Sequence, residues 1–226
     1  GRKHFTKVAK TTALTTIGQG DLAELLVPIP PLPEQQKIAD ILSTLDEKVD
    51  QNEQLINKMQ EIRKGLMQSL LTKGIVHKQF IKTELGEIPV KWELKKLDAI
   101  CKKNTIGLVK TMTKYYVDEG VPLIRNSDIK ENNITKEKMI YLDEQFAYEN
   151  KDKMLKLGDI VTVHTGDIGT SAVIEEELVG AHGFATLNTT PECNIIDKYY
   201  LCWYFNSGHF KKQAYAVSTG DGRNNL

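Results

Sequence analysis

The sequence of 226 residues lacks several features that would each assign it to a class of protein. Its three cysteines form no C-x-x-C pair, which argues against a disulfide framework or a zinc site and indicates a reducing compartment. No apolar run is long enough to span a membrane, and the first residues show no signal-peptide pattern. We therefore expect a cytoplasmic protein with no bound metal and no membrane association.

Excess charge and catalytic motifs are also missing. Basic and acidic residues number 30 each, so bulk charge does not indicate nucleic acid. Gly18-Gln19-Gly20 has neither the third glycine nor the preceding strand of a nucleotide-cofactor loop. Glu175-Glu176-Glu177 is a consecutive run, whose side chains would alternate in direction rather than converge as in a nuclease site. We expect no catalytic residues and no cofactor bound by this chain.

Proline is absent from the long stretch that follows Pro33, and the first glycine in that stretch is Gly65. A proline costs little at the start of a helix, because its fixed φ suits the first turn and its missing N–H would be unpaired there anyway. The acid that follows, Glu34, is favourable at the positive end of the helix dipole. This pattern predicts one long helix over 32–74.

Apolar residues recur every seven positions along this stretch. The two heptad core positions are occupied mainly by aliphatic side chains, at Ile38, Leu42, Leu45, Val49, Asn52, Ile56, Met59, Arg63, Leu66 and Leu70. A heptad sustained over more than four repeats is typical of a coiled coil, which needs a second helix to cover its apolar stripe. A lone polar residue such as Asn52 usually sets register or orientation. The alternative is a long helix packed on its own domain, and we favour a dimerising spacer.

From about residue 83 the pattern changes to short apolar segments separated by turn residues. The predicted elements are a strand over 121–125, a hairpin within 158–174, a strand over 184–188, and a helix that Asp197 caps and that continues through Ala214. This mixture predicts an α+β fold: one globular domain with a curved mixed or antiparallel sheet, plus the long coiled-coil helix.

The two ends of the chain are similar in sequence. His4-Phe5-Thr6-Lys7-Val8-Ala9 shares the pattern His-Phe-x-Lys-x-Ala with His209-Phe210-Lys211-Lys212-Gln213-Ala214. This short repeat predicts that the chain begins inside one copy of a module and stops at the corresponding point of the next.

Several segments resemble one known family, and they occur in that family's order. Residues 21–39, which include Pro30-Pro31-Leu32-Pro33-Glu34-Gln35-Gln36, closely resemble the element that ends each target-recognition domain in specificity (S) subunits of type I restriction-modification enzymes. Residues 85–92 are similar to the start of the next such domain, and residues 158–169 look like its central hairpin. The combination covers nearly the whole chain and is specific.

The resemblance implies a subunit that reads DNA sequence and has no catalytic activity. In the family, two globular domains each read half of a split target, and two long antiparallel helices separate them and dock methyltransferase (M) subunits. The implied partners are double-stranded DNA, the methyltransferase subunit and, in a complete restriction enzyme, the restriction (R) subunit. S-adenosylmethionine would belong to the methyltransferase subunit.

The chain departs from the usual plan of the family, because it contains one long helix and one nearly full recognition domain. We divide it into an end segment over 1–31, a spacer helix over 32–74 and the main recognition domain over 75–226. One explanation is a permuted half-subunit that forms a homodimer through an antiparallel coiled coil, and the other is a central piece of a longer subunit. We favour the first, because the end segment would complete the recognition domain. A two-fold dimer would read an inverted repeat with a fixed spacer.

Side chains that form paired hydrogen bonds read DNA bases, with Arg suited to guanine and Asn or Gln to adenine. Such residues commonly lie on loops of a rigid scaffold. Residues 99–117 also contain four lysines and no acid, which fits contact with phosphates. Our candidates for DNA contact are Arg125, Asn126, Ser127, His164, Thr165, Arg223, Asn224 and Asn225 on loops, with Lys102, Lys103, Lys110 and Lys114 as phosphate clamps.

Each candidate also has an ordinary structural interpretation. Arg125 is equally suited to an ion pair with Asp128 or Glu131, and His164 to a buried strand position with a backbone partner. Residues 223–225 are consistent with a polar tail, and the lysines with a solvated surface. For the chain as a whole, the alternative is a coiled-coil adaptor or scaffold that reads no DNA.

Overall fold

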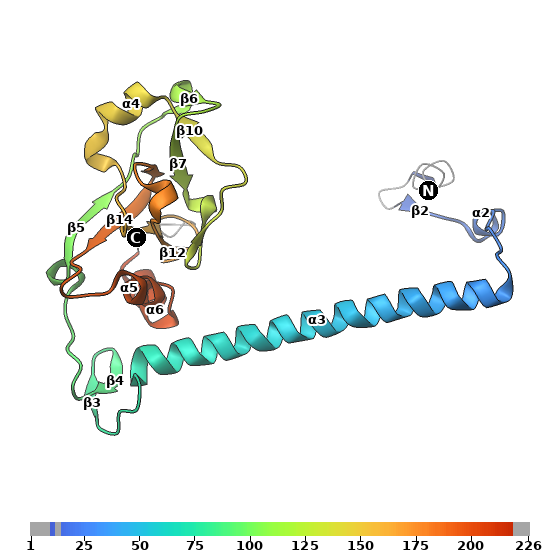
Figure 1. Ribbon diagram of the computed structural model, residues 1–226, viewed down its shortest axis with the longest axis horizontal. Coiled ribbons are helices and arrows are strands. Elements are labelled where there is room, and N and C mark those ends of the chain that lie inside the picture. The colour runs from blue at the N-terminus through green and yellow to red at the C-terminus, as the bar shows by residue number, and fades with distance from the viewer. Residues whose placement is uncertain (1–9, 12–14, 219–226) are drawn as a thin grey trace. The chain divides into compact units, whose positions relative to one another are not determined.

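The computed structural model of the chain describes residues 10–11 and 15–218 (Figure 1). It divides into two compact units, Gly1–Gln60 and Glu61–Leu226. The long helix α3 (Leu32–Lys73) begins in the first unit and ends in the second. Within the described residues, no helix is both long enough and apolar enough to cross a membrane.

The first unit opens with small elements and a proline-rich stretch. A ribbon of β1 (Lys10–Thr11) and β2 (Thr15–Thr16) precedes the short helix α2 (Gln19–Ala23). Residues 24–31 are irregular and contain three prolines. Proline has no N–H to donate and clashes with a preceding helical turn, so this stretch can extend neither α2 nor a sheet. Helix α3 begins directly after it, and the carbonyl of Pro31 accepts hydrogen bonds from the amides of Glu34 and Gln35.

Helix α3 is an uninterrupted element of 42 residues, which confirms the predicted helix over 32–74 to within one residue. It ends at Gly74, whose φ of +65° is the left-handed conformation that terminates helices and suits glycine. The amide of Gly74 still donates to the carbonyl of Leu70 at 3.2 Å. A Cβ at Gly74 would approach Cζ2 of Trp92 to 2.6 Å, so the site also has no room for a side chain.

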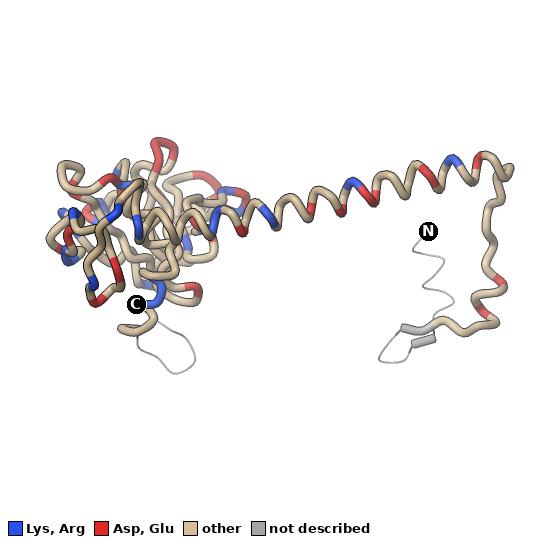
Figure 2. The backbone as a smooth tube through the Cα atoms, turned by 90° about the horizontal axis from the view of Figure 1, so that it is seen from below, with Lys and Arg blue, Asp and Glu red and all other residues tan. Residues whose placement is uncertain are grey.

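None of the side chains of α3 is buried among the described residues. Its predicted core side chains are between 44% and 58% exposed, namely Ile38, Leu42, Leu45, Val49, Ile56, Met59, Leu66 and Leu70. Acidic and basic residues are interspersed along its length (Figure 2). An amphipathic helix gains most of its stability by burying its apolar face. Within the described residues, the apolar stripe of α3 is therefore left uncovered, and its pairing with a second helix stays a prediction.

The second unit opens with a hairpin of β3 (Phe80–Thr83) and β4 (Gly86–Pro89). An extended stretch through Trp92 then leads to the 3-10 turn η1 (Leu97–Ala99) and into the body of the unit. Other 3-10 turns are η2 (Thr113–Tyr115), η3 (Asn126–Asp128), η4 (Lys151–Lys153) and η5 (Glu176–Leu178).

The described body of this unit contains two four-stranded sheets. The antiparallel sheet has the order β12 (Ser171–Val173), β11 (Ile160–Val163), β14 (Thr186–Pro191) and β5 (Cys101–Ile106). The mixed sheet has the order β13 (His182–Phe184), β7 (Val121–Arg125), β10 (Ile140–Leu142) and β6 (Tyr116–Val117), with β13 parallel to β7. A separate ribbon pairs β8 (Ile129–Lys130) with β9 (Asn133–Ile134).

These sheets confirm the α+β class, with the strands divided between two sheets rather than gathered in one. The strand over 121–125 and the hairpin within 158–174 are confirmed. The single strand predicted over 184–188 is wrong, because Ala185 adopts φ +48° and separates β13 from β14. The amide of Ala185 donates to the carbonyl of Leu108 at 2.8 Å, so a crossing loop fixes the corner at which the chain passes between sheets.

The last described elements are the helices α5 (Lys198–Phe205) and α6 (Gly208–Val217). Asp197 caps α5 as predicted, because its carboxylate accepts a hydrogen bond from the amide of Tyr200 at 2.8 Å. The prediction that this helix continues through Ala214 is wrong. Ser207 caps a new helix by accepting a hydrogen bond from the amide of Phe210 at 3.2 Å.

The core of the second unit joins these layers. Ile124 of the mixed sheet packs in one cluster with Val161 and Ala172 of the antiparallel sheet. Helix α4 (Glu144–Glu149) inserts Phe146 among side chains of the mixed sheet. Helix α5 packs against the antiparallel sheet through Phe205 and its neighbours. The loops that carry the predicted contact residues thus project from a packed scaffold.

Candidate nucleic-acid interface

Two of the lysines predicted to contact phosphate, Lys110 and Lys114, lie on a shared aromatic stack. Tyr115 and Phe146 stack with their ring centroids 3.9 Å apart. The Nζ of Lys110 lies 4.8 Å from the centroid of Phe146 and donates to Oδ1 of Asn150 at 2.8 Å. The Nζ of Lys114 lies 4.8 Å from the centroid of Tyr115. Both lysines remain exposed, so the rings position the ammonium groups without removing them from solvent.

Three more lysines lie in the segment that follows α4 or contact it. Lys103 on β5 donates to the carbonyl of Asp152 at 3.1 Å, and Lys153 donates to the carbonyl of Gly107 at 2.9 Å. The Nζ of Lys151 lies 4.9 Å from the ring centroid of a neighbouring tyrosine. We refer to these five residues as the lysine cluster: Lys103, Lys110, Lys114, Lys151 and Lys153.

Sequence reasoning missed Lys151 and Lys153. The criterion was a stretch of basic residues free of acids, and Glu149 and Asp152 lie among these two lysines. The carbonyl of Asp152, and not its carboxylate, holds Lys103. Lys102 does not join the cluster, although it is the neighbour of Lys103. Successive side chains on a strand point to opposite faces, and Lys102 forms an ion pair with Glu192 at 3.3 Å.

The two predicted base-contact loops lie side by side. Asn126 follows β7, His164 follows β11, and the amide of His164 donates to Oδ1 of Asn126 at 3.4 Å. His164 is half-buried and lies just beyond its strand, where its Nδ1 is 3.1 Å from the hydroxyl of Thr165. We call Arg125, Asn126, Ser127, His164 and Thr165 the loop pair. The structure thus brings together residues that are 38 positions apart in the sequence.

Arg125 is held firmly within its own loop. Its Nε donates to Oδ2 of Asp128 at 2.9 Å and its Nη2 donates to Oδ1 at 2.7 Å, while Nη2 also donates to the carbonyl of Lys138. These hydrogen bonds to the buried carboxylate of Asp128 raise the pKa of Arg125. The arrangement matches the ion-pair interpretation with Asp128. Contact between Arg125 and a base stays a prediction, and its observed role is to shape the turn that presents Asn126 and Ser127.

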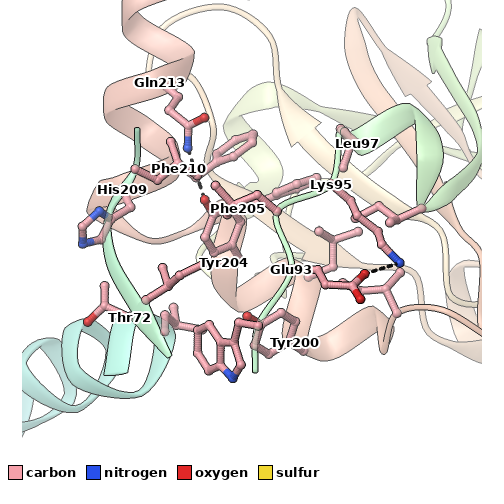
Figure 3. Close-up of a pocket in the computed structure, with 18 of the residues that line it drawn as sticks. Thr72, Glu93, Lys95, Leu97, Tyr200, Tyr204, Phe205, His209, Phe210 and Gln213 are labelled. Atoms are coloured by element: carbon pink, nitrogen blue, oxygen red, sulfur yellow. Dashed lines mark hydrogen bonds and ion pairs between the residues drawn. The ribbon is translucent and has the colours of Figure 1, made fainter. Parts of the chain in front are cut away.

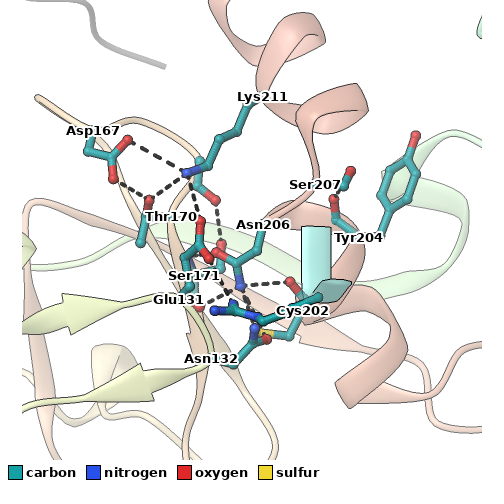
Figure 4. Close-up of polar contacts among 12 residues, drawn as sticks. Glu131, Asn132, Asp167, Thr170, Ser171, Cys202, Tyr204, Asn206, Ser207 and Lys211 are labelled. Carbon is teal, nitrogen blue, oxygen red and sulfur yellow. Dashed lines mark hydrogen bonds and ion pairs between the residues drawn. The ribbon is translucent and has the colours of Figure 1, made fainter. Parts of the chain in front are cut away.

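The loop that carries His164 is anchored to α6 by Lys211 (Figure 4). The Nζ of Lys211 lies 3.1 Å from the hydroxyl of Thr170, 3.5 Å from a carboxylate oxygen of Glu131 and 3.7 Å from one of Asp167. Glu131 also pairs with Arg63 of α3, at 2.8 Å. Each carboxylate is therefore balanced by a cation, which favours one conformation of the loop.

Asn206 explains why α5 stops where it does. Its amide group pairs with the backbone of Ser171 in both directions, with its Oδ1 accepting from the amide and its Nδ2 donating to the carbonyl, each at 2.9 Å (Figure 4). Its Nδ2 also donates to the carbonyl of Cys202 at 3.0 Å and to Oδ1 of Asn132 at 3.2 Å. Because Asn206 is buried, these partners satisfy groups that would otherwise be costly to desolvate.

A buried histidine links the mixed sheet to α4. The Nε2 of His182 donates to the carbonyl of Ala147 at 3.1 Å, and its Nδ1 has no partner among the described residues. Burial lowers the pKa of His182, which keeps the ring neutral. Burial also raises the pKa of Cys101 to about 11 and that of Cys202 to about 12, so both thiols stay protonated at neutral pH.

Some of the predictions lie outside the described residues. These are the candidate contacts Arg223, Asn224 and Asn225, and the first half of the repeat that begins at His4. The other predicted contacts are all placed within the second unit.

Residues 2–61 match the family model of the type I restriction modification DNA specificity domain. The chain is 29% identical over 218 residues to the type I restriction enzyme MjaVIII specificity subunit of Methanocaldococcus jannaschii, covering 90% of this chain and 49% of that protein. It is 26% identical to the EcoBI specificity subunit of Escherichia coli, covering 88% of this chain and 45% of that protein.

The chain is similar to type I restriction-modification specificity subunits along about nine-tenths of its length. It spans about half the length of the curated relatives that it matches. The crystal structure of the HsdS subunit from Thermoanaerobacter tengcongensis superimposes with a TM-score of 0.50 at 19% identity, covering 99% of this chain and 55% of that one. At this identity the superposition supports the fold alone.

A pocket of about 580 Å³ lies in the second unit, between the last turns of α3, the stretch around Trp92 and the helices α5 and α6 (Figure 3). Its aromatic lining is formed by Trp92, Tyr200, Tyr204, Phe205 and Phe210. Gln68, Thr72, His209 and Gln213 contribute polar groups to its wall. This volume lies within the range of sites that bind a peptide or a drug-sized molecule.

Proposed function

We propose that this chain is a non-catalytic subunit that reads DNA sequence for a type I restriction-modification enzyme. The observation that carries the proposal is the match to specificity subunits along about nine-tenths of the chain. The lysine cluster and the loop pair support it, because they supply separate groups for the two tasks of such a subunit. One task is to hold the DNA backbone, and the other is to distinguish bases.

The lysine cluster is suited to phosphate contact. Lys110 and Lys114 are exposed, and each is held over an aromatic ring. Among the described residues, neither forms an ion pair with a carboxylate, so their charge is available to an external anion. Lysine contributes a point charge without base preference, so these contacts would place the protein on DNA irrespective of sequence. Lys102 is paired with Glu192 and would contribute less.

The loop pair is suited to contact with base edges. Ser127 is exposed, and Asn126, His164 and Thr165 are partly exposed on two adjoining loops. Asn offers the donor and acceptor that adenine requires in the major groove, and Ser and Thr hydroxyls contact any base. Arg125 and Lys211 would act indirectly, by fixing the shape of the two loops.

Dimerisation through α3 would give the subunit two readers. Asn52 lies next to the midpoint of Leu32–Lys73. In an antiparallel pair of equal helices, Asn52 would therefore lie close to its own copy, where paired amides can fix the register. Apolar side chains such as Leu45 and Met59 lie at equal distances on either side of it, so the stripe is apolar in both directions. Two identical readers related by two-fold symmetry would recognise an inverted repeat with a fixed spacer.

The methyltransferase subunit would be the main protein partner, and the restriction subunit would join it in the complete enzyme. S-adenosylmethionine would be bound by the methyltransferase subunit. The test is to co-express this chain with a type I methyltransferase subunit and to map modified bases across the host DNA by sequencing. We expect modification confined to a split inverted repeat. A matched control is a Leu45→Lys, Met59→Lys variant, which should lose modification because the apolar stripe no longer pairs.

The other outcomes are informative. A split but asymmetric target would mean a second and different recognition domain, as in a longer subunit. The absence of modification, together with DNA binding that does not weaken as salt rises, would contradict the proposal and favour a coiled-coil adaptor.

A further inference from the structure

The stretch before α3 is unusually apolar for an exposed segment. We refer to residues 24–31 as the proline segment. Within it Leu26 is 95% exposed, Val27 is 69% exposed and Ile29 is 77% exposed. Consecutive apolar side chains with this exposure indicate a binding surface rather than a solvated loop. Pro28, Pro30 and Pro31 have no N–H to donate and favour an extended, polyproline-like backbone, which loses little entropy on binding.

The pocket of the second unit matches the chemistry of such a segment. Extended proline-containing peptides bind grooves that are lined by aromatic rings, and Trp92, Tyr200 and Tyr204 line this one (Figure 3). A proline segment offers carbonyl acceptors and few donors. The wall of the pocket carries donors, in the indole of Trp92 and the amide of Gln213, whereas the hydroxyl of Thr72 already donates to the carbonyl of Gln68 at 2.6 Å. The Nε2 of Gln213 already donates to the hydroxyl of Tyr204 at 3.2 Å, which orients both groups.

The positions of the proline segment and the pocket along α3 indicate how the two would meet. The proline segment leads directly into the first turn of α3, whereas Gln68, Leu71 and Thr72 from its last turns line the pocket. Antiparallel pairing of two α3 helices places the first turn of one beside the last turn of the other. The partner's proline segment would then be delivered to the pocket without any change in α3. This step rests on the proposed dimer.

We propose that the proline segment of one copy of this chain binds the aromatic pocket of a second copy. The dimer would contain two such contacts, one at each end of the paired helices. Leu26, Val27 and Ile29 would cover the apolar wall that α5, α6 and the stretch around Trp92 leave open. Each recognition domain would thereby be fixed to the end of the helix pair, which sets the distance and angle between the two readers.

Cross-linking between unlike copies tests this contact directly. One copy carries Leu26→Cys and the other carries Gln213→Cys, with different affinity tags, in a background of Cys101→Ser and Cys193→Ser. The third cysteine, Cys202, is buried. A short bismaleimide should give a covalent product that carries both tags. The matched control replaces Gln213→Cys by Lys212→Cys, one residue along α6 and outside the pocket lining, and should give about tenfold less product if the segment is bound specifically.

A further cysteine substitution distinguishes this contact from the pairing of the α3 helices. Asn52→Cys should cross-link to its own copy if α3 pairs in the antiparallel sense. Efficient Asn52→Cys dimers without a product between Leu26→Cys and Gln213→Cys would overturn the pocket contact and leave the dimer standing. Absence of both products would overturn both proposals. A product within a single chain, from Leu26→Cys and Gln213→Cys on the same molecule at high dilution, would also overturn the exchange between copies.

Charge substitutions provide an independent measurement. Leu26→Asp with Ile29→Asp should raise the dimer dissociation constant by at least about tenfold in analytical ultracentrifugation. Val179→Asp is the control, because Val179 is also exposed in the second unit and does not line the pocket. Equal dissociation constants for the two variants would contradict a bound proline segment.

Discussion

The stripe of α3 and the body of the second unit are stabilised in different ways. The described part of α3 has no buried side chain, whereas the body buries aliphatic and aromatic residues in clusters that join both sheets and α5. Both regions contain similar residue types, mainly Ile, Leu and Val. The difference shows that apolar content alone does not make a core. The body buries its apolar side chains within itself, whereas the apolar stripe of α3 stays exposed within the described residues.

The largest expected effect is the loss of a core aromatic in the body. Phe205 is buried and stacks on Phe210 at 4.3 Å between centroids, so Phe205→Ala should lower the free energy of unfolding by about 3–5 kcal/mol. Leu45→Ala in the stripe should change the unfolding of the dilute protein by less than about 1 kcal/mol. Urea unfolding followed by tryptophan fluorescence measures this, because Trp92 and Trp203 both lie in the second unit. Equal losses of unfolding free energy in Phe205→Ala and Leu45→Ala would contradict this difference between the body and α3.

The next effect concerns the polar junction that ends α5. Asn206→Ala would leave the amide and the carbonyl of Ser171 without their partners, at a cost of about 1–3 kcal/mol. Gln213→Ala removes an exposed amide with a single hydrogen bond and should cost no more than about 0.5 kcal/mol. The same unfolding measurement compares the two variants. If Asn206→Ala were as mild as Gln213→Ala, the helix break would have another cause.

Measurements of DNA affinity should distinguish the lysine cluster from lysines elsewhere on the surface. Replacing both Lys110 and Lys114 by Ala should weaken binding to all sequences and reduce the slope of log affinity against log salt by about 1.8, since each phosphate contact contributes about 0.9. Lys95→Ala is the control, because Lys95 pairs with Glu93 on the surface. Fluorescence anisotropy with DNA of two unrelated sequences over a range of salt is the measurement. An unchanged slope would remove the cluster from the interface.

Two glycines of the long-helix region should respond to the same substitution with opposite sign. Gly65→Ala lies in the interior of α3 with open space around it, and should stabilise the helix by about 0.5–1 kcal/mol. Gly74→Ala should destabilise by more than about 1 kcal/mol, because φ is +65° and Trp92 blocks the Cβ. Circular dichroism during thermal unfolding follows both changes. Stabilisation by Gly74→Ala would contradict the observed helix end.

The smallest effect is a dependence of stability on pH. Burial lowers the pKa of His182 in the folded state, so the unfolded chain binds the proton more readily. The contribution of His182 is fully present above its unfolded pKa of about 6.5 and is lost as the pH falls below that value towards the folded pKa. When the pH is lowered from 7.5 to 5.5, the free energy of unfolding should therefore fall less in His182→Gln than in the unaltered protein. Urea titration at the two pH values measures this difference. An equal loss in both would assign the pH dependence elsewhere.

Much of the fold was predictable because its signals are local. The heptad, Pro33 and the following acid predicted the helix from residue 32, and Asp197 predicted the start of α5. The errors fell where distant groups decide the outcome. Ala185 turns the chain at a position that reads as a continuous strand, because the loop at Leu108 binds its amide.

The candidate interface was likewise predictable only in part. The sequence indicated residue types suited to DNA contact, but two facts needed the tertiary structure. Lys102 and Lys103 have separate partners, although they are adjacent, because side chains alternate along a strand. Lys151 and Lys153 join Lys110, although they lie about forty residues away, because α4 packs on the mixed sheet.

By itself, the sequence determined the resemblance to specificity subunits, the α+β class and the long helix with its apolar stripe, because periodicity, caps and proline act within a few residues. Only the tertiary structure decided where α5 stops, how the strands divide between two sheets and which candidates lie together. It also revealed the aromatic pocket beside the end of α3. These features depend on hydrogen bonds and packing between residues far apart in the chain, such as Asn206 with Ser171, and no local pattern encodes them.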